Sequence, residues 1–159
     1  MSLAGLSAFC RLLLPRNEVQ LIKYFTARVT DRRPTNPGAP VRQQTYLRAL
    51  ATCSDVEVYF GHYLSHEKRR PLAAGGKVVT DSAGKVQFAS VLIDEEKGSD
   101  VNLAAHLMHD AHRRLFDAAV VISNDSDLTT PIELVRRDLG LVVGVVNPHA
   151  RQSVLSRAP

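Results

Sequence analysis

The pattern of apolar and polar positions divides the chain into short strand-like segments separated by polar loops. Segments 19–29, 56–64 and 86–93 are rich in β-branched and aromatic residues, which predicts β-strands. Segments 116–123 and 141–148 are almost continuously apolar, a pattern typical of strands buried on both faces of a parallel sheet. These last two strands are therefore expected to lie in the interior of the molecule.

Apolar residues recur at helical spacing between these strands. Helices are predicted over 3–14, 40–51 and 130–139, and another is predicted to begin at Ser99, whose hydroxyl is expected to cap it. Segment 65–85 is basic, then rich in glycine, and without periodicity, which predicts a long surface excursion. The alternation of strands and helices indicates an α/β three-layer fold with a mainly parallel sheet.

Composition points to one cytoplasmic domain. The chain has 159 residues, with 45% hydrophobic and 23% charged residues, which is ordinary for a soluble globular protein. We assign the domain to residues 1–150 and treat 151–159 as a tail. Since the sequence has no apolar run near the ~20 residues of a membrane helix, no membrane partner is expected. Cys10 and Cys53 form no metal-ligand cluster, so both are predicted to be reduced thiols.

The charge distribution favours an anionic partner. The net charge is +4, and basic residues cluster at 32–33, 68–70, 113–114 and 136–137. An enzyme that uses a metal on nucleic acid needs such a surface around an acidic centre, because the basic groups hold phosphates and the carboxylates hold the cation. An arginine-rich solvated surface is the alternative for each cluster taken alone.

Carboxylates stand at two predicted strand-to-helix junctions. Asp125 and Asp127 follow the apolar strand 116–123, and Asp100 follows the strand before it. In parallel sheets, ligand sites form beyond the carboxyl ends of the strands. Neighbouring carboxylates raise one another's pKa unless a cation lies between them, and oxygen ligands suit Mg²⁺ or Mn²⁺. The three aspartates are thus predicted to bind one ion that polarises a phosphoryl oxygen and activates a water.

Simpler roles are open for the same residues. Asp127 would also serve as a helix cap, and Asp100 stands in a first helical turn, where carboxylates are favoured. Lys97 is expected to face a phosphate or to balance the acidic charge. The polar residues around Asp125 are turn formers or donors to the metal ligands: Ser123, Asn124 and Ser126.

Two stretches of the chain resemble the NYN branch of the PIN-like nuclease superfamily. They are EEKGSDVNLAAHLMHDA and FDAAVVISNDSDLTTPIELVRRDLGLVVGVVNP, and YFTARV and RQQTYLRAL extend the likeness over most of the chain. The resemblance implies a Rossmann-like sheet, an acidic site for Mg²⁺ or Mn²⁺, hydrolysis of RNA phosphodiester bonds and a possible homodimer. Carried over by motif, it makes Asp100, Asp125 and Asp127 catalytic metal ligands. Glu96 matches an acid often found before the lysine.

The sequence departs from this family pattern at its beginning. Family members open with a central strand that ends in an aspartate, commonly D-G-x-N, whereas Met1 here stands directly before helix 3–14. A start codon assigned too far downstream is the explanation we favour over a truncated domain. Without that strand and its carboxylate, the chain is expected to be inactive or weakly active and of low stability.

Other functions remain as alternatives to the ribonuclease. Lys68, Arg69 and Arg70 are predicted to contact RNA from a mobile loop, with Tyr59 or Tyr63 stacking on bases. A non-catalytic RNA-binding or protein-interaction module of the same fold would use the same surface. The stretch DSDLT also matches the D-x-D-x-T pattern of haloacid-dehalogenase-like phosphatases, but the sequence has no lysine after Thr129, which argues against that class.

Overall fold

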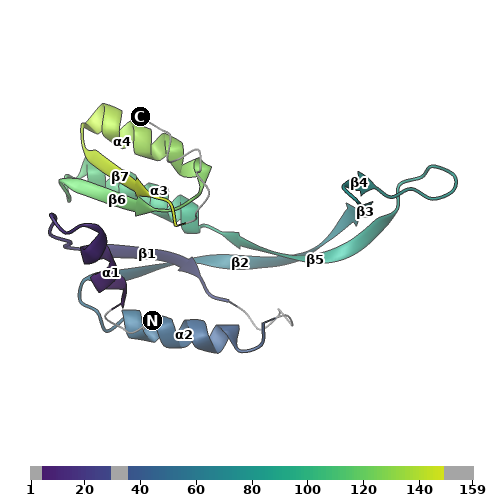
Figure 1. The fold of residues 1–159 in the computed structure, drawn as a ribbon, viewed down its shortest axis with the longest axis horizontal. Coiled ribbons are helices and arrows are strands. Elements are labelled where there is room, and N and C mark those ends of the chain that lie inside the picture. Colours follow the sequence, from purple (N-terminus) through teal and green to yellow (C-terminus); the bar gives the residue numbers. More distant parts are fainter. Residues whose placement is uncertain (1–4, 30–35, 149–159) are drawn as a thin grey trace.

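The computed structural model describes residues 5–29 and 36–148, so the tail 151–159 and the basic pair 32–33 lie outside the described residues. Strands β1 (Ile22–Ala27) and β2 (Val56–Pro71) pair in parallel. Strands β6 (Ala118–Ile122) and β7 (Val142–Val146) also pair in parallel. The expected mixed α/β architecture with a mainly parallel central sheet is therefore confirmed (Figure 1).

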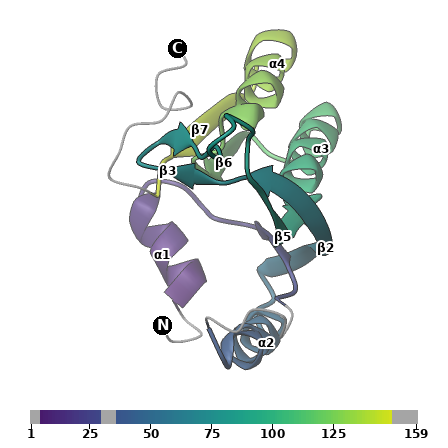
Figure 2. The same ribbon diagram turned by 90° about the vertical axis from the view of Figure 1, so that its right-hand side faces the viewer.

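Helices cover the strands on two sides (Figure 2). Helices α1 (Gly5–Leu13) and α2 (Ala39–Leu50) lie on one side, and α3 (Ser99–His112) and α4 (Thr129–Leu139) lie on the other. The alternation of side chains along β1 explains the layering, because successive residues of a strand point to opposite faces. Ile22 and Tyr24 pack in the core cluster under α2, whereas Lys23 and Phe25 contact α3.

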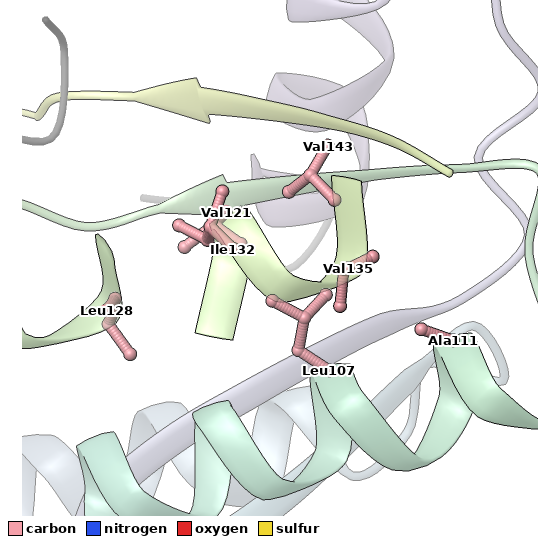
Figure 3. Close-up of a cluster of buried hydrophobic side chains, with 7 residues drawn as sticks. All are labelled: Leu107, Ala111, Val121, Leu128, Ile132, Val135 and Val143. Atoms are coloured by element: carbon pink, nitrogen blue, oxygen red, sulfur yellow. The ribbon is translucent and has the colours of Figure 1, made fainter. Parts of the chain in front are cut away.

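The larger core lies between α3, α4 and the pair β6–β7 (Figure 3). Leu128, Ile132 and Val135 are at most 1% exposed, and they pack against Val121 of β6 and Val143 of β7. The burial predicted for these strands is confirmed for one face only, because Ile122 and Val142 on the other face are 38% and 66% exposed. Gly140 ends α4 in the left-handed region, at φ 65°.

The parallel sheet is interrupted between β1 and β6. Among the described strands, β1 pairs only with β2, and β6 pairs only with β7, so the sheet consists of two halves. Helix α3 joins the halves, because it contacts β1 and β2 as well as α4. The interruption falls at the place in the sheet where the resemblance puts the strand that ends in an aspartate.

Segment 65–85 is a regular arm, and the expectation of an irregular surface loop there is wrong. Strand β2 continues to Pro71 and pairs in antiparallel fashion with β5 (Phe88–Lys97), so a two-stranded ribbon projects from the body (Figure 1). The short strands β3 (Ala73–Ala74) and β4 (Lys77–Val78) lie near its tip. Because neither face of the ribbon is buried in a core, the sequence lacks the apolar alternation that signals a strand.

Candidate active site

Asp100 is placed by a close approach of two backbones at the start of α3. Gly98 precedes the helix with φ 95°, and its carbonyl accepts a hydrogen bond of 2.8 Å from the amide of Asn102. Strand β2 passes beside this junction at Gly61, where an added Cβ would lie 2.4 Å from the carbonyl oxygen of Lys97. The two glycines thus allow α3 to begin against β2, which sets Asp100 in the first helical turn at the root of the arm.

Ser99 does not cap α3, contrary to the expectation from the sequence. The residue that precedes the helix is Gly98, and the helix has no side-chain cap. The Ser99 hydroxyl oxygen is instead buried without a hydrogen-bond partner, and the Cβ position of Gly61 lies 3.0 Å from it. The left-handed backbone at Gly98 shifts the cap position by one residue, so the serine hydroxyl is directed at β2.

Asp125 is placed by a tight turn at the carboxyl end of β6. The Ser123 amide donates to the carbonyl of Val146 (3.1 Å), and the Ser123 hydroxyl accepts from the Asp125 amide (3.1 Å). The Asp125 Oδ1 atom accepts from the amide of Asp127 (2.9 Å) and so caps the single turn η1 (Ser126–Leu128). The capping role that the sequence offered to Asp127 therefore belongs to Asp125, and the Asp127 residue is exposed.

The two junctions bring Asp100 and Asp125 together. Burial raises the pKa of Asp100, and the negative charge of Asp125 and a side-chain hydrogen bond with it raise that pKa further. The charges of Glu96 and Asp127 act on the pKa of Asp100 in the same direction and more weakly. The site is thus a zone of negative charge centred on Asp100 and Asp125.

The other polar residues expected at the site take different positions. Lys97 forms an ion pair with Glu95 on the arm, at 2.9 Å, so its charge is already matched by that carboxylate. Ser126 accepts a hydrogen bond from the Thr129 hydroxyl through its carbonyl oxygen, at 2.7 Å, and Asn124 is exposed. The Ser123 hydroxyl acts on the Asp125 backbone, which makes it a turn former.

The donor set at the site consists of carboxylate oxygens. In the described part of the chain, no group of three His, Cys, Asp or Glu side chains is arranged to hold a metal ion, so the expected three-aspartate group is not assembled there. Asp127 is held away by η1, where it follows the residue that caps the turn. Mg²⁺ is commonly bound through one or two carboxylates together with waters and substrate phosphates, so the Asp100–Asp125 pair suits that ion.

A second charged cluster lies between α3 and β1, and the sequence did not reveal it. Lys23 donates to the Asp110 carboxylate (2.6 Å) and lies 3.4 Å from the Nδ1 atom of His106. The Lys23 and Asp110 side chains are only 18% and 13% exposed. The ring of His106 packs on Tyr59, with centroids 3.9 Å apart.

Tyr59 belongs to this cluster, so its ring has protein neighbours in place of an RNA base. It stacks on Phe25 with ring centroids 5.3 Å apart, and its hydroxyl donates to Glu57 at 2.6 Å. That hydrogen bond, followed by burial and the charge of Glu57, raises the pKa of Tyr59 to about 12. A phenol with this pKa stays protonated at neutral pH and holds its place beside α3.

Comparison with known proteins gives a family and one informative relative. The profile of the family described as "NYN domain" matches residues 62–159, which is more than half of the chain. A protein from Pseudomonas putida (strain DSM 28022 / S16), named 6-hydroxy-3-succinoylpyridine 3-monooxygenase HspA, is 30% identical over 136 residues. The match covers 83% of this chain and 43% of that protein, so the chain spans less than half the length of this relative. No solved structure gives a significant match.

Proposed function

This chain belongs to the NYN domain family, and from that premise we propose that it is a divalent-metal-dependent ribonuclease. The observation that carries the proposal is the meeting of Asp100 and Asp125, whose carboxyl groups come from separate strand-to-helix junctions and lie close enough for the charge of Asp125 to raise the pKa of Asp100. A raised carboxyl pKa inside a group of acids is the signature of a site that a cation completes. RNA is the proposed substrate because of the family, and the hydrolysis of a phosphodiester bond is the proposed reaction.

In this proposal, the residues that would hold the cation are Asp100 and Asp125. A bound Mg²⁺ or Mn²⁺ would supply polarisation of a phosphoryl oxygen and a water of lowered pKa. The chain's own contribution is to hold the carboxylates in place: Gly98 sets the first turn of α3, and the η1 turn fixes one oxygen of Asp125. Asp127 and Glu96 add negative potential that attracts the cation.

Cleavage of a fluorogenic RNA with Mg²⁺ or Mn²⁺, and with a chelator, tests the proposal. Asp125→Asn keeps the size of the side chain and its capping oxygen but removes the charge, and it is expected to reduce turnover at least about a hundredfold. Asp117→Asn is the matched control, because Asp117 stands beside the opposite end of the same strand and is exposed. Robust cleavage that persists in Asp125→Asn, or cleavage that ignores the chelator, would exclude this site.

A second candidate function is a non-catalytic RNA-binding module of the same fold. It is favoured by the observation that only two of the three expected aspartates come together in the described residues. Calorimetric titration with Mn²⁺ separates the candidates, because a binding module would show no heat that depends on Asp100 or Asp125. Conversion of 6-hydroxy-3-succinoylpyridine is measured in parallel, because the relative from Pseudomonas putida is named for that compound.

A further inference from the structure

The arm formed by β2 and β5 has two faces of opposite charge. Residues that lie directly opposite in an antiparallel pair share a face, and successive residues alternate between faces. On one face, the register places three cations and one carboxylate; they are Lys68, Arg70, Lys97 and Glu95. On the other face it places one cation and three carboxylates, which are Arg69, Glu67, Asp94 and Glu96. We call the first the basic face and the second the acidic face.

The charged side chains of the basic face form ion pairs along the arm. Glu95 lies between two lysines, 2.9 Å from Lys97 and 3.8 Å from Lys68, and their proximity lowers the pKa of Glu95. His62 and His66 belong to the same face. At the root of the arm, exposed Arg28 lies over the ring of Phe60, 4.3 Å from its centroid. The positive charge therefore extends from the body to Arg70.

The arm starts at the edge of the sheet where the aspartates meet. The parallel pairing of β1 ends at Ala27, opposite Gly61, and β2 continues beyond it as the arm. Gly61 touches the backbone of Ser99, the residue before Asp100. Gly61 alternates with His62, so this contact lies on the side of the acidic face, and a ligand on the basic face would reach the same edge of the sheet from the opposite side.

From these observations we infer that the basic face binds the sugar-phosphate backbone of a double-helical RNA stem, beside the edge of the sheet at which the aspartates meet. The inference rests on the proposed function, since it names the form of RNA that would be cut. Ten paired positions of an antiparallel ribbon span about 33 Å, a length over which one nucleic-acid strand presents several phosphates. Exposed Lys and Arg side chains bind phosphates without reading sequence, as duplex recognition requires.

The place of the aromatic side chains favours a duplex over a single strand. Proteins that hold single-stranded RNA stack its bases on aromatic rings. In the paired part of the arm, Tyr63 and Phe88 lie on the acidic face, and the guanidinium of Arg69 covers the Phe88 ring at 4.9 Å. The basic face instead presents aliphatic side chains between its cations, such as Leu64 and Val91.

The three consecutive basic residues provide a matched test, because Arg69 points away from its two neighbours. Binding of a labelled RNA duplex of roughly 20 base pairs is measured by fluorescence anisotropy, with the chelator present so that no cleavage occurs. Lys68→Ala/Arg70→Ala is expected to weaken binding at least about tenfold and to lower the slope of log affinity against log salt by about 2. Arg69→Ala is expected to change affinity less than about twofold, and a single strand is expected to bind more weakly than the duplex.

Three outcomes would overturn the inference: no binding of the duplex by the native chain, an equal loss in Arg69→Ala, or tighter binding of the single strand. Circular dichroism checks that the variants are folded. The oligomeric state of the double variant is measured by light scattering. If that state changes while RNA affinity does not, the basic face binds a second copy of the chain, and the inference is overturned. If the native chain binds the duplex but does not cleave RNA with metal, the inference on the arm stands and the ribonuclease proposal fails.

Discussion

The carboxyl groups of Asp100 and Asp125 lie close enough to interact, although Asp100 follows β5 and Asp125 follows β6. Burial and the negative charge of Asp125 raise the pKa of Asp100. A protonated carboxyl group donates to an ionised one, whereas two ionised groups repel each other. Without a cation, the pair is therefore a local cost to the fold at neutral pH.

The first prediction concerns the stability of Asp100→Asn in the absence of metal. Because the pKa of Asp100 is raised on folding, its contribution to stability is fully present below the pKa of the unfolded chain and is lost as the pH rises through the folded value. The asparagine side chain of Asp100→Asn does not ionise, so the variant does not lose stability in this way as the pH rises. In a chelator at about pH 7, Asp100→Asn is expected to be more stable than the native chain by about 0.5 kcal/mol, a value reduced for the exposure of the residue.

The measurement is urea unfolding of both proteins between about pH 4 and pH 7. The advantage of Asp100→Asn is expected to shrink toward the acid end, where the native aspartate is protonated. Asp117→Asn is the control, since Asp117 is exposed beside the amino end of β6. A destabilised Asp100→Asn at neutral pH would contradict the prediction.

The second prediction is that a divalent cation makes the native chain more stable than Asp100→Asn. Mn²⁺ or Mg²⁺ binds the ionised pair and not the unfolded chain, so it is expected to raise the melting temperature of the native protein. At a concentration of about 100 times the dissociation constant, the gain is about 2.7 kcal/mol. Asp100→Asn and Asp125→Asn are expected to lose most of that shift, and Asp117→Asn to keep it. Equal shifts in all variants, measured by differential scanning fluorimetry, would place the cation elsewhere.

Much of the core and half of the site follow from local sequence patterns. The apolar runs predicted β6 and β7 correctly as strands, and one face of each strand packs in the core against α3 and α4. Gly140 marks the end of α4 because few other residues adopt its backbone conformation. The pairing of Asp100 with Asp125 was predicted from parallel strands that end at one edge. In the structure, β5 before Asp100 is antiparallel to β2, so the position of Asp100 follows from the close approach of β2 to the start of α3.

The remaining features depend on packing that no local pattern encodes. Lys23 and Asp110 are 87 positions apart, and they meet only because α3 lies across β1. From residue 65 to 71, β2 shows no apolar alternation because both faces of the arm are outside the core, so the sequence did not predict that the strand continues there. Asp127 resembles a partner of Asp125 in the sequence, but the η1 turn directs its amide, and not its carboxylate, at that residue.

The third prediction concerns Gly61→Ala. The added methyl group would lie 2.4 Å from the carbonyl oxygen of Lys97 and 3.0 Å from the amide nitrogen of Ser99, and both are backbone atoms that cannot rotate away. The start of α3 must therefore shift from β2, which is expected to cost about 2–4 kcal/mol of stability and to lower metal-dependent activity with it.

Gly76→Ala is the comparison for this variant. Gly76 lies near the tip of the arm, where nothing is within 4 Å of the added Cβ, although its φ of 78° makes alanine slightly strained. Gly76→Ala is expected to cost no more than about 1 kcal/mol. Chemical denaturation measures the free energy of unfolding of both variants. Equal losses of stability would show that the close approach of β2 to α3 does not contribute to stability.

The fourth prediction concerns the ion pair between Lys23 and Asp110, which joins β1 to α3 at 2.6 Å. Lys23→Met leaves the Asp110 carboxylate partly buried without its cation, so it is expected to cost about 1–3 kcal/mol. Asp110→Asn is expected to cost a similar amount, because it leaves the Lys23 ammonium beside His106. The double variant is expected to be more stable than the sum of the single losses predicts, with a coupling of about 1 kcal/mol or more.

A double-mutant cycle measured by urea unfolding gives this coupling, and Arg137 with Asp138 provides an exposed pair for comparison. That pair is also 2.6 Å apart, but its side chains are 70% and 51% exposed, so its coupling is expected to be below about 0.5 kcal/mol. Helix α3 carries Asp100 at its first turn and Asp110 at its last. If the pair anchors α3, Lys23→Met will also weaken the metal-induced rise in melting temperature, whereas Arg137→Met will not. Additive losses in the first pair would show that apolar packing alone holds α3 on β1.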